Sequence, residues 1–122
     1  MPVRSLDSPV IKWPDKSRID KAFRQWISGL AVSNKALIGA GYYGSYARGD
    51  WGVGSDLDII LIVDSIQGPK NKRNLSWDCS SLPVAVDLTV YTKDEWEQIR
   101  QSDSKLANTL RRQIVWAKQP QL

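Results

Sequence analysis

The sequence of 122 residues contains no histidine and a single cysteine, Cys79. The absence of histidine excludes a His-ligated zinc site, a Ser-His-Asp triad and a histidine general base. One cysteine excludes an intramolecular disulfide and a Cys-x-x-Cys metal pair, which agrees with a reducing compartment. We expect Cys79 to be an inert, half-buried thiol. Any acid–base or metal chemistry in this chain must therefore use carboxylates.

Long apolar runs are also missing. Residues 1–14 lack the apolar core of a signal sequence, and no segment approaches the ~18 apolar residues of a membrane span. We therefore expect a soluble, cytoplasmic protein without membrane contact. Seventeen Lys and Arg against thirteen Asp and Glu give a formal charge of +4, a mild excess that is compatible with a polyanionic ligand. Because the basic residues are scattered and no RNA-recognition motif is present, we do not expect nucleic acid as a direct ligand.

The composition indicates one compact domain over residues 1–122, with its core at about 15–119. With 42% hydrophobic and 25% charged residues, the chain can bury one core and is short for two. Hydrophobic periodicity predicts a helix from about Asp15 to Ala31, which Asp15 or Ser17 is suited to cap. Three apolar segments predict strands at 35–43, 56–63 and 84–91, the second of them buried on both faces.

Two further helices are predicted near the C-terminus. Thr92 and Glu95 have the spacing of a capping box, which predicts a helix from Lys93. After a pause at 101–104, apolar residues at helical spacing predict a last helix that ends near Gln119. Three tryptophans fall in predicted helices, where we expect them to pack in the core: Trp26, Trp96 and Trp116.

Three acidic residues interrupt the apolar strands. Asp56 and Asp58 are two residues apart, so on a strand their side chains share one face. If Asp87 lies on a neighbouring strand and faces the same way, the three carboxylates converge and repel one another. Hard divalent cations such as Mg²⁺ neutralise such a cluster best. The alternative is that these are ordinary aspartates at strand ends, which cap turns or face water.

The loop at 44–55, before the paired aspartates, is suited to hold phosphate. Gly44 lets the backbone approach an anion closely, and Ser45 offers a hydroxyl and an N–H group. Arg48 can add charge-assisted hydrogen bonds, or it can instead pair with Asp50 or Asp56 and order the loop. Together with the carboxylates, this loop predicts a site for a nucleoside triphosphate, without the lysine of a phosphate-loop motif.

These residues resemble a known family. The string from Gly44 to Gly49, the paired Asp56 and Asp58, and Asp87 in a later strand are similar to the minimal nucleotidyltransferases of the DNA polymerase β superfamily. The similarity extends from the helix near Asp15 to the last helix. It implies an α+β fold in two layers, in which helices pack against a mixed β-sheet.

The resemblance also implies a reaction, the transfer of a nucleoside monophosphate from a triphosphate to a hydroxyl. In that reaction Asp56 and Asp58 bridge two Mg²⁺ ions, and Asp87 completes the shell of one ion and helps to deprotonate the attacking hydroxyl. Gly44 and Ser45 hold the triphosphate tail. Two ions of this kind stabilise the attacking and leaving oxygens of an in-line displacement. Mn²⁺ is accepted by the same oxygen ligands.

Small stand-alone members of this family resemble antitoxins that are paired with a HEPN-domain ribonuclease toxin and inactivate it by adenylylating a tyrosine. The resemblance therefore implies ATP as the nucleotide, a HEPN toxin as the partner, and a protein adenylyltransferase activity. Two alternatives stay open. One is a non-catalytic antitoxin that neutralises its toxin by contact, and the other is nucleotidyl transfer to RNA or a small molecule.

Several residues have no assigned role in this scheme. Trp51 and Trp77 fall in predicted loops, where local packing is favoured over stacking on a nucleotide base. The basic group at 70–73 is expected to form a solvated connection, with a phosphate or partner contact as the alternative.

Overall fold

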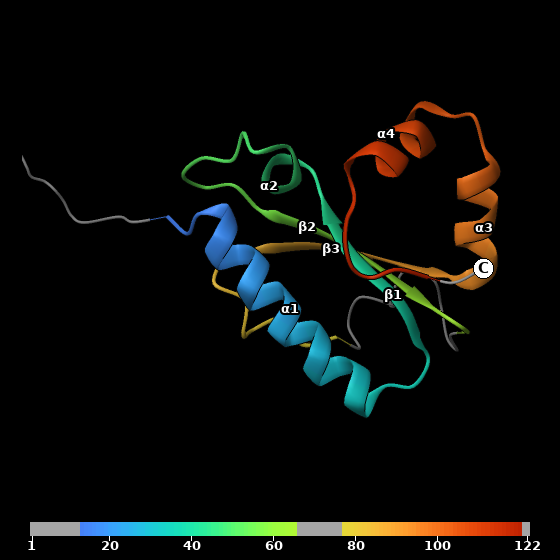
Figure 1. Ribbon diagram of the computed structural model, residues 1–122, viewed down its shortest axis with the longest axis horizontal. Coiled ribbons are helices and arrows are strands. Elements are labelled where there is room, and N and C mark those ends of the chain that lie inside the picture. Colours follow the sequence, from blue (N-terminus) through green and yellow to red (C-terminus); the bar gives the residue numbers. More distant parts are fainter. Residues whose placement is uncertain (1–12, 66–76, 121–122) are drawn as a thin grey trace, which may run out of the picture.

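The computed structural model describes residues 13–65 and 77–120. These residues form four helices and four strands (Figure 1), which follow the chain in this order: α1 (Lys16–Ser33), β1 (Leu37–Tyr43), α2 (Ser45–Arg48), β2 (Leu57–Val63), β3 (Val86–Thr92), α3 (Lys93–Gln101), α4 (Lys105–Gln113) and β4 (Val115–Lys118). The basic group at 70–73 lies outside the described residues. Within the described part of the chain, none of the helices combines the length and apolar character needed to cross a membrane.

The four strands form one mixed sheet in the order β3-β2-β1-β4. The strands β2 and β3 run parallel, whereas β1 is antiparallel to both β2 and β4. The predicted mixed sheet is therefore confirmed. β2 is an inner strand, and its residues 59–63 are almost completely buried, as the continuous apolar run predicts for a strand covered on both sides.

Helices cover both faces of the sheet (Figure 1). On one face, Ile59 and Leu61 belong to the same core cluster as Phe23 of α1. On the other face, Ile60 belongs to a second cluster with Trp96 of α3 and with Leu110 of α4. Because successive side chains of a strand point to opposite faces, the sheet lies between α1 and the pair α3–α4. Helices thus pack against a mixed sheet on both of its sides, and the predicted α+β fold is confirmed.

The predicted starts of two helices are confirmed. The Asp15 side chain accepts a hydrogen bond from the backbone N–H of Arg18 at 2.9 Å and caps α1. At α3, the Thr92 hydroxyl accepts from the N–H of Glu95, and the Glu95 carboxylate accepts from the N–H of Thr92. Each cap supplies an acceptor to a backbone donor that lacks a partner within its helix.

The predicted last helix is too long. It ends at Gln113, and residues 115–118 form β4 instead, so Trp116 lies on a strand. Val115 and Trp116 have high strand propensity, and the free edge of β1 offers backbone partners: Gly41 pairs with Trp116. The apolar spacing at Ile114 and Ala117 suggests helix, but pairing with an open sheet edge outweighs this local pattern.

Two smaller differences concern the segment around the paired aspartates. Residues 45–48 form the short helix α2, with a hydrogen bond from the N–H of Arg48 to the carbonyl of Gly44 at 2.9 Å. β2 begins at Leu57, so Asp56 precedes the strand instead of belonging to it.

Gly41 provides a test of the β1–β4 pairing. A Cβ atom at Gly41 would lie 2.6 Å from Cγ2 of Ile114 and 2.9 Å from the carbonyl oxygen of Val115. We expect Gly41→Ala to lower the free energy of unfolding by roughly 1–3 kcal/mol, because backbone must move to admit the methyl group. In the control Gly29→Ala, the Cβ atom would have no neighbour within 4 Å, and removal of a helical glycine should stabilise by about 0.5–1 kcal/mol. Urea unfolding of both variants measures the difference, and an unchanged Gly41→Ala protein would contradict the pairing.

Candidate active site

Asp58 and Asp87 lie side by side on neighbouring parallel strands. They are register partners at the beginnings of β2 and β3. Both carboxylates face the side of the sheet that α3 and α4 cover. Alternate residues of a strand share one face, so Asp58 points to the same side as Ile60 and Ile62, which pack with Trp96 and Leu110. We call these two residues the acid pair. The predicted convergence of Asp58 with Asp87 is therefore present in the structure.

The carboxylate of Asp58 is electrostatically strained. Partial burial, followed by the charges of Asp87 and Asp56, raises its pKa above the ordinary value of 3.8, and the guanidinium of Arg48 partly opposes this shift. Asp87 and Asp56 therefore both act on Asp58. Asp56 is exposed and sits just before β2, at the rim of the acid pair.

The three carboxylates are not drawn into one tight cluster. Among residues 13–65 and 77–120, no group of three or more His, Cys, Asp or Glu side chains is arranged closely enough to hold a metal ion. The donors present are nevertheless of the kind that a hard cation such as Mg²⁺ prefers, because all are carboxylate oxygens. Half-buried Asp58, with Asp87 beside it and Asp56 at the rim, fits such an ion in chemistry and in charge.

Gly44 closes over the acid pair. Its φ is +79°, and a Cβ atom at this position would lie 2.1 Å from Oδ2 of Asp58. Any side chain would therefore collide with the carboxylate, in addition to the strain of a left-handed conformation. Ser45 follows directly and opens α2. The structure thus brings the Gly-Ser turn and Asp58 together, as the sequence predicts.

Arg48 at the end of α2 forms an ion pair. Its Nε donates to Oδ2 of Asp50 at 3.0 Å, and both side chains are exposed. This contact is the alternative in which Arg48 pairs with Asp50 and orders the loop. The charge of Arg48 still opposes the rise in the pKa of Asp58. Because an exposed pair of this kind contributes little to stability, the guanidinium is free to exchange Asp50 for a phosphate.

The structure adds two residues that the sequence analysis did not assign to the site. Tyr43 of β1 pairs in register with Asp58. Burial raises the pKa of its phenol, a hydrogen bond with Thr89 opposes the shift, and the charges of Asp58 and Asp87 raise the pKa further. Tyr43 thus forms a wall beside the acid pair. Its place before Gly44 at the end of a predicted strand is the signal that could have identified it.

The second unassigned residue is Gln113, the last residue of α4. Its Oε1 accepts a hydrogen bond from the N–H of Gly44 at 3.4 Å. The two residues are 69 positions apart, so no local sequence pattern indicates this contact. Through Gln113, the end of α4 reaches the turn that covers Asp58.

The remaining aromatic residues near the turn have structural roles. Tyr46 is fully buried and donates its hydroxyl to the carbonyl of Pro14 at 2.9 Å. Trp51 stacks on Tyr46 with ring centroids 5.7 Å apart, so it packs locally, as expected. Trp77 is likewise packed against the core on the α1 side. Cys79 is free and half-buried, and burial raises the pKa of its thiol, as expected for an inert group.

A substitution at Gly44 tests the close approach to Asp58. We expect Gly44→Ala to destabilise the protein by several kcal/mol, on the order of 1–2 for the left-handed backbone and more for the collision with the carboxylate. Gly49→Ala is the control for a positive φ in open space, since Gly49 has φ +89° and no neighbour near its Cβ position, with a ψ of 9° against −149° for Gly44. Thermal unfolding of both variants shows whether a side chain at Gly44 costs more than a positive φ in open space. Equal losses would contradict the contact between Gly44 and Asp58.

The raised pKa of Asp58 predicts the sign of its effect on stability. Folding holds the Asp58 proton more tightly, so stability falls as pH rises from the ordinary value of 3.8 through the higher folded value. In the presence of EDTA, we therefore expect Asp58→Asn to raise the melting temperature at neutral pH and to leave it unchanged at about pH 3, where free Asp is protonated. Asp64→Asn, at the opposite end of β2, serves as the control. A melting temperature of Asp58→Asn below that of the parent at neutral pH would refute the repulsion.

Comparison with known proteins identifies the family. Residues 30–110 match the sequence model of the nucleotidyltransferase domain family. No curated protein matches the chain. The fold is similar to that of a candidate nucleotidyltransferase from Sulfolobus solfataricus, with a TM-score of 0.59, 22% identity, and coverage of 83% of this chain and 80% of that one. A crystal structure of a toxin–antitoxin with AMP-PNP gives a TM-score of 0.52 at 21% identity, with coverage of 80% and 74%.

At these identities, the solved structures establish the fold, and the predicted polymerase-β-like architecture is confirmed. The match to the family model is independent of them, and it covers more than half of the chain. The matched segment runs from the end of α1 to α4 and includes Gly44 and the acid pair. The chain therefore belongs to the nucleotidyltransferase domain family.

Proposed function

We propose that this chain is a single-domain, metal-dependent nucleotidyltransferase that transfers AMP from ATP to a hydroxyl of a protein partner. The observation that carries the proposal is the acid pair of Asp58 and Asp87 beneath Gly44. Two repelling carboxylates lie opposite each other on neighbouring strands, under a turn that admits no side chain. This arrangement lowers the stability of the fold. Such a cost is typical of a site that is built for a ligand.

The acidic residues are the proposed metal ligands. Asp56, Asp58 and Asp87 supply oxygen donors for two Mg²⁺ ions, which when bound would polarise the triphosphate and neutralise the charge of the attacking and leaving oxygens. Burial and then the charges of Asp87 and Asp56 raise the pKa of Asp58, so a bound cation would relieve the repulsion.

The other site residues orient the nucleotide and move the proton. Gly44 and Ser45 bind the triphosphate tail, and Arg48 adds charge-assisted hydrogen bonds to it. The acceptor oxygen then forms a bond to the α-phosphorus while the bond between that phosphorus and the bridging oxygen breaks. Pyrophosphate leaves, and the proton of the acceptor hydroxyl passes to Asp87.

The acceptor is proposed to be a tyrosine of a HEPN ribonuclease toxin, with this chain as the antitoxin. Two observations support a macromolecular acceptor. Asp56 and Asp87 are exposed, so the site opens to the surface. The structural similarity to a toxin–antitoxin with AMP-PNP supports both a toxin partner and an adenine nucleotide.

Label transfer tests this function. The protein is incubated with Mg²⁺, each α-labelled triphosphate in turn, and the product of the adjacent gene or a host lysate as the source of the toxin. We expect ATP to label the toxin, and Asp58→Asn and Asp87→Asn to reduce labelling at least ~100-fold, more than the loss caused by outer-shell changes at metal sites. Asp64→Asn should label normally, because Asp64 is exposed at the far end of β2.

The outcomes separate the alternatives. Full labelling by Asp58→Asn would contradict the proposed chemistry. Label on RNA would keep the reaction and replace the acceptor. If the variant with all three aspartates changed to asparagine still neutralised the toxin, the chain would be an antitoxin that acts by contact.

A further inference from the structure

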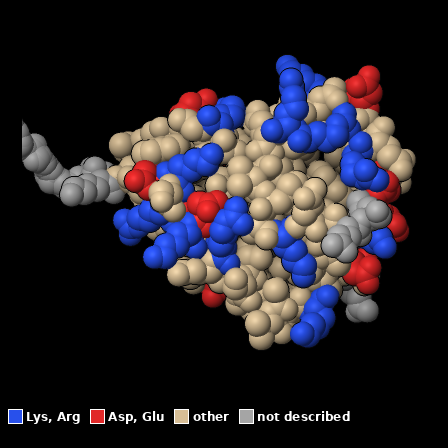
Figure 2. Space-filling model, viewed as in Figure 1, with Lys and Arg blue, Asp and Glu red and all other residues tan. Residues whose placement is uncertain are grey.

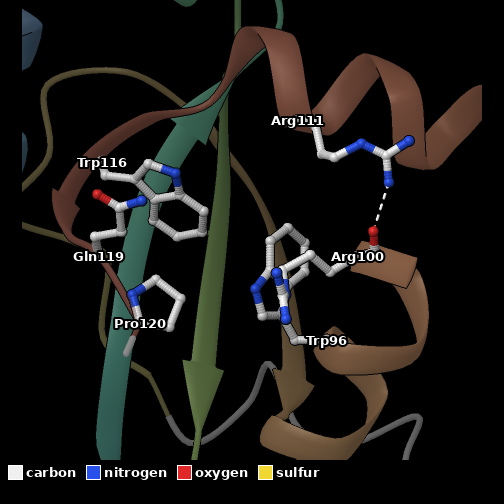
Figure 3. Close-up of a pocket in the computed structure, with 6 residues that line it drawn as sticks. All are labelled: Trp96, Arg100, Arg111, Trp116, Gln119 and Pro120. Carbon is white, nitrogen blue, oxygen red and sulfur yellow. Dashed lines mark hydrogen bonds between the residues drawn. The ribbon is translucent and has the colours of Figure 1, made fainter. Parts of the chain in front are cut away.

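A cavity lies on the α3–α4 face and shares no residue with the site at Asp58. Its volume is about 360 Å³, within the range of small-molecule sites. Figure 3 shows its walls, which come from α3, α4 and the chain that includes β4: Trp96, Arg100, Arg111, Trp116, Gln119 and Pro120. We call it the tryptophan cavity.

Two indoles supply its aromatic wall. Trp96 and Trp116 meet edge to face, with ring centroids 5.6 Å apart and an interplanar angle of 75°. Trp96 is held in the core and is 3% exposed, whereas Trp116 is half-buried on β4. Trp116, held in place by Trp96, therefore offers a planar ligand an apolar surface at little cost in side-chain entropy.

Two guanidinium groups supply its charge. Nη1 of Arg111 donates to the carbonyls of Arg100 at 2.6 Å and Ser102 at 3.0 Å, and Nη2 donates to Asn108. These acceptors are neutral, so they fix the side chain without balancing its positive charge. Some of the five N–H groups of the guanidinium remain without one of these acceptors. Figure 2 shows basic side chains gathered over α4.

The second guanidinium, that of Arg100, is more weakly committed. It forms an ion pair with Glu97, with Nη2 2.7 Å from Oε1, and its side chain is about half exposed. In Figure 3 the side chain extends beside Trp96. Because such surface pairs contribute little to stability, Arg100 can exchange Glu97 for a ligand anion.

We propose that the tryptophan cavity is a second nucleotide-binding site, distinct from the acid pair. An aromatic wall next to guanidinium groups matches a base joined to a phosphate, since bases stack on indoles and phosphates accept bidentate hydrogen bonds from arginine. None of the described residues that line the cavity is acidic, and the amide of Gln119 can pair with the edge of a base. The ligand is a mononucleotide, either free or at the end of an RNA strand.

The test follows the indole N–H signal of Trp116 by nitrogen–proton correlation NMR, assigned by its loss in Trp116→Phe. EDTA is present throughout, so that the carboxylates of the acid pair hold no cation. We expect AMP at millimolar concentration to shift this signal in a saturable manner. A 5′-phosphorylated oligoribonucleotide and inorganic phosphate are titrated in parallel. Saturation by AMP assigns a free nucleotide as the source, and saturation by the oligoribonucleotide alone assigns an RNA end.

Two variants are expected to change affinity in opposite directions. Arg100→Gln should weaken AMP binding about tenfold through loss of a charge-assisted contact, and Glu97→Gln should tighten it by releasing Arg100. Arg18→Gln, which changes the charge equally on exposed α1, should bind as the parent does. An unmoved Trp116 signal with both nucleotide probes, or equal affinity in Arg100→Gln and the parent, would overturn the proposal.

Discussion

The parallel pairing of β2 with β3 is the constraint on which the rest of the site depends. It places Asp58 opposite Asp87 on one face of the sheet. Carboxylates so placed repel each other, and burial together with this repulsion raises the pKa of Asp58. The surrounding structure holds them there because the rest of β2 is buried on both faces, between α1 on one side and α3 and α4 on the other. A one-residue slip would turn the whole apolar set of β2 to the wrong faces, so the register of the acid pair is fixed by hydrophobic burial and not by the carboxylates themselves.

The turn above the acid pair follows from the same constraint. β1 ends at Tyr43, beside Asp58, so the chain that leaves β1 must pass directly over the carboxylate. Only glycine fits there, because both its φ of +79° and the space near Asp58 exclude a side chain. The segment that follows closes into α2, and Gln113 of α4 contacts the Gly44 N–H group from the other end of the chain. The site thus combines one strained turn with three strands and a distant helix.

The sequence was sufficient for the parts of this architecture that are determined locally. The caps at Asp15 and Thr92 and the buried run of β2 all follow from spacing and propensity. The rest depends on contacts between distant segments. β4 forms because β1 has an open edge that can accept Trp116, and the helical spacing of Ile114 and Ala117 carries no information about that edge. The contact of Gln113 with Gly44, across 69 positions of the chain, was unpredictable for the same reason.

The central claim is that the acid pair binds divalent cations, and Mn²⁺ tests it directly because the ion broadens nearby NMR signals. In a titration of the ¹⁵N-labelled protein, the account predicts that the amide signals of residues 43–45, 57–59 and 86–88 broaden first, and that this order is lost in Asp58→Asn. The acidic residues at the start of α3, exposed Asp94 and half-buried Glu95, provide an internal comparison. Broadening centred on α3, or spread evenly over the surface, would contradict the account.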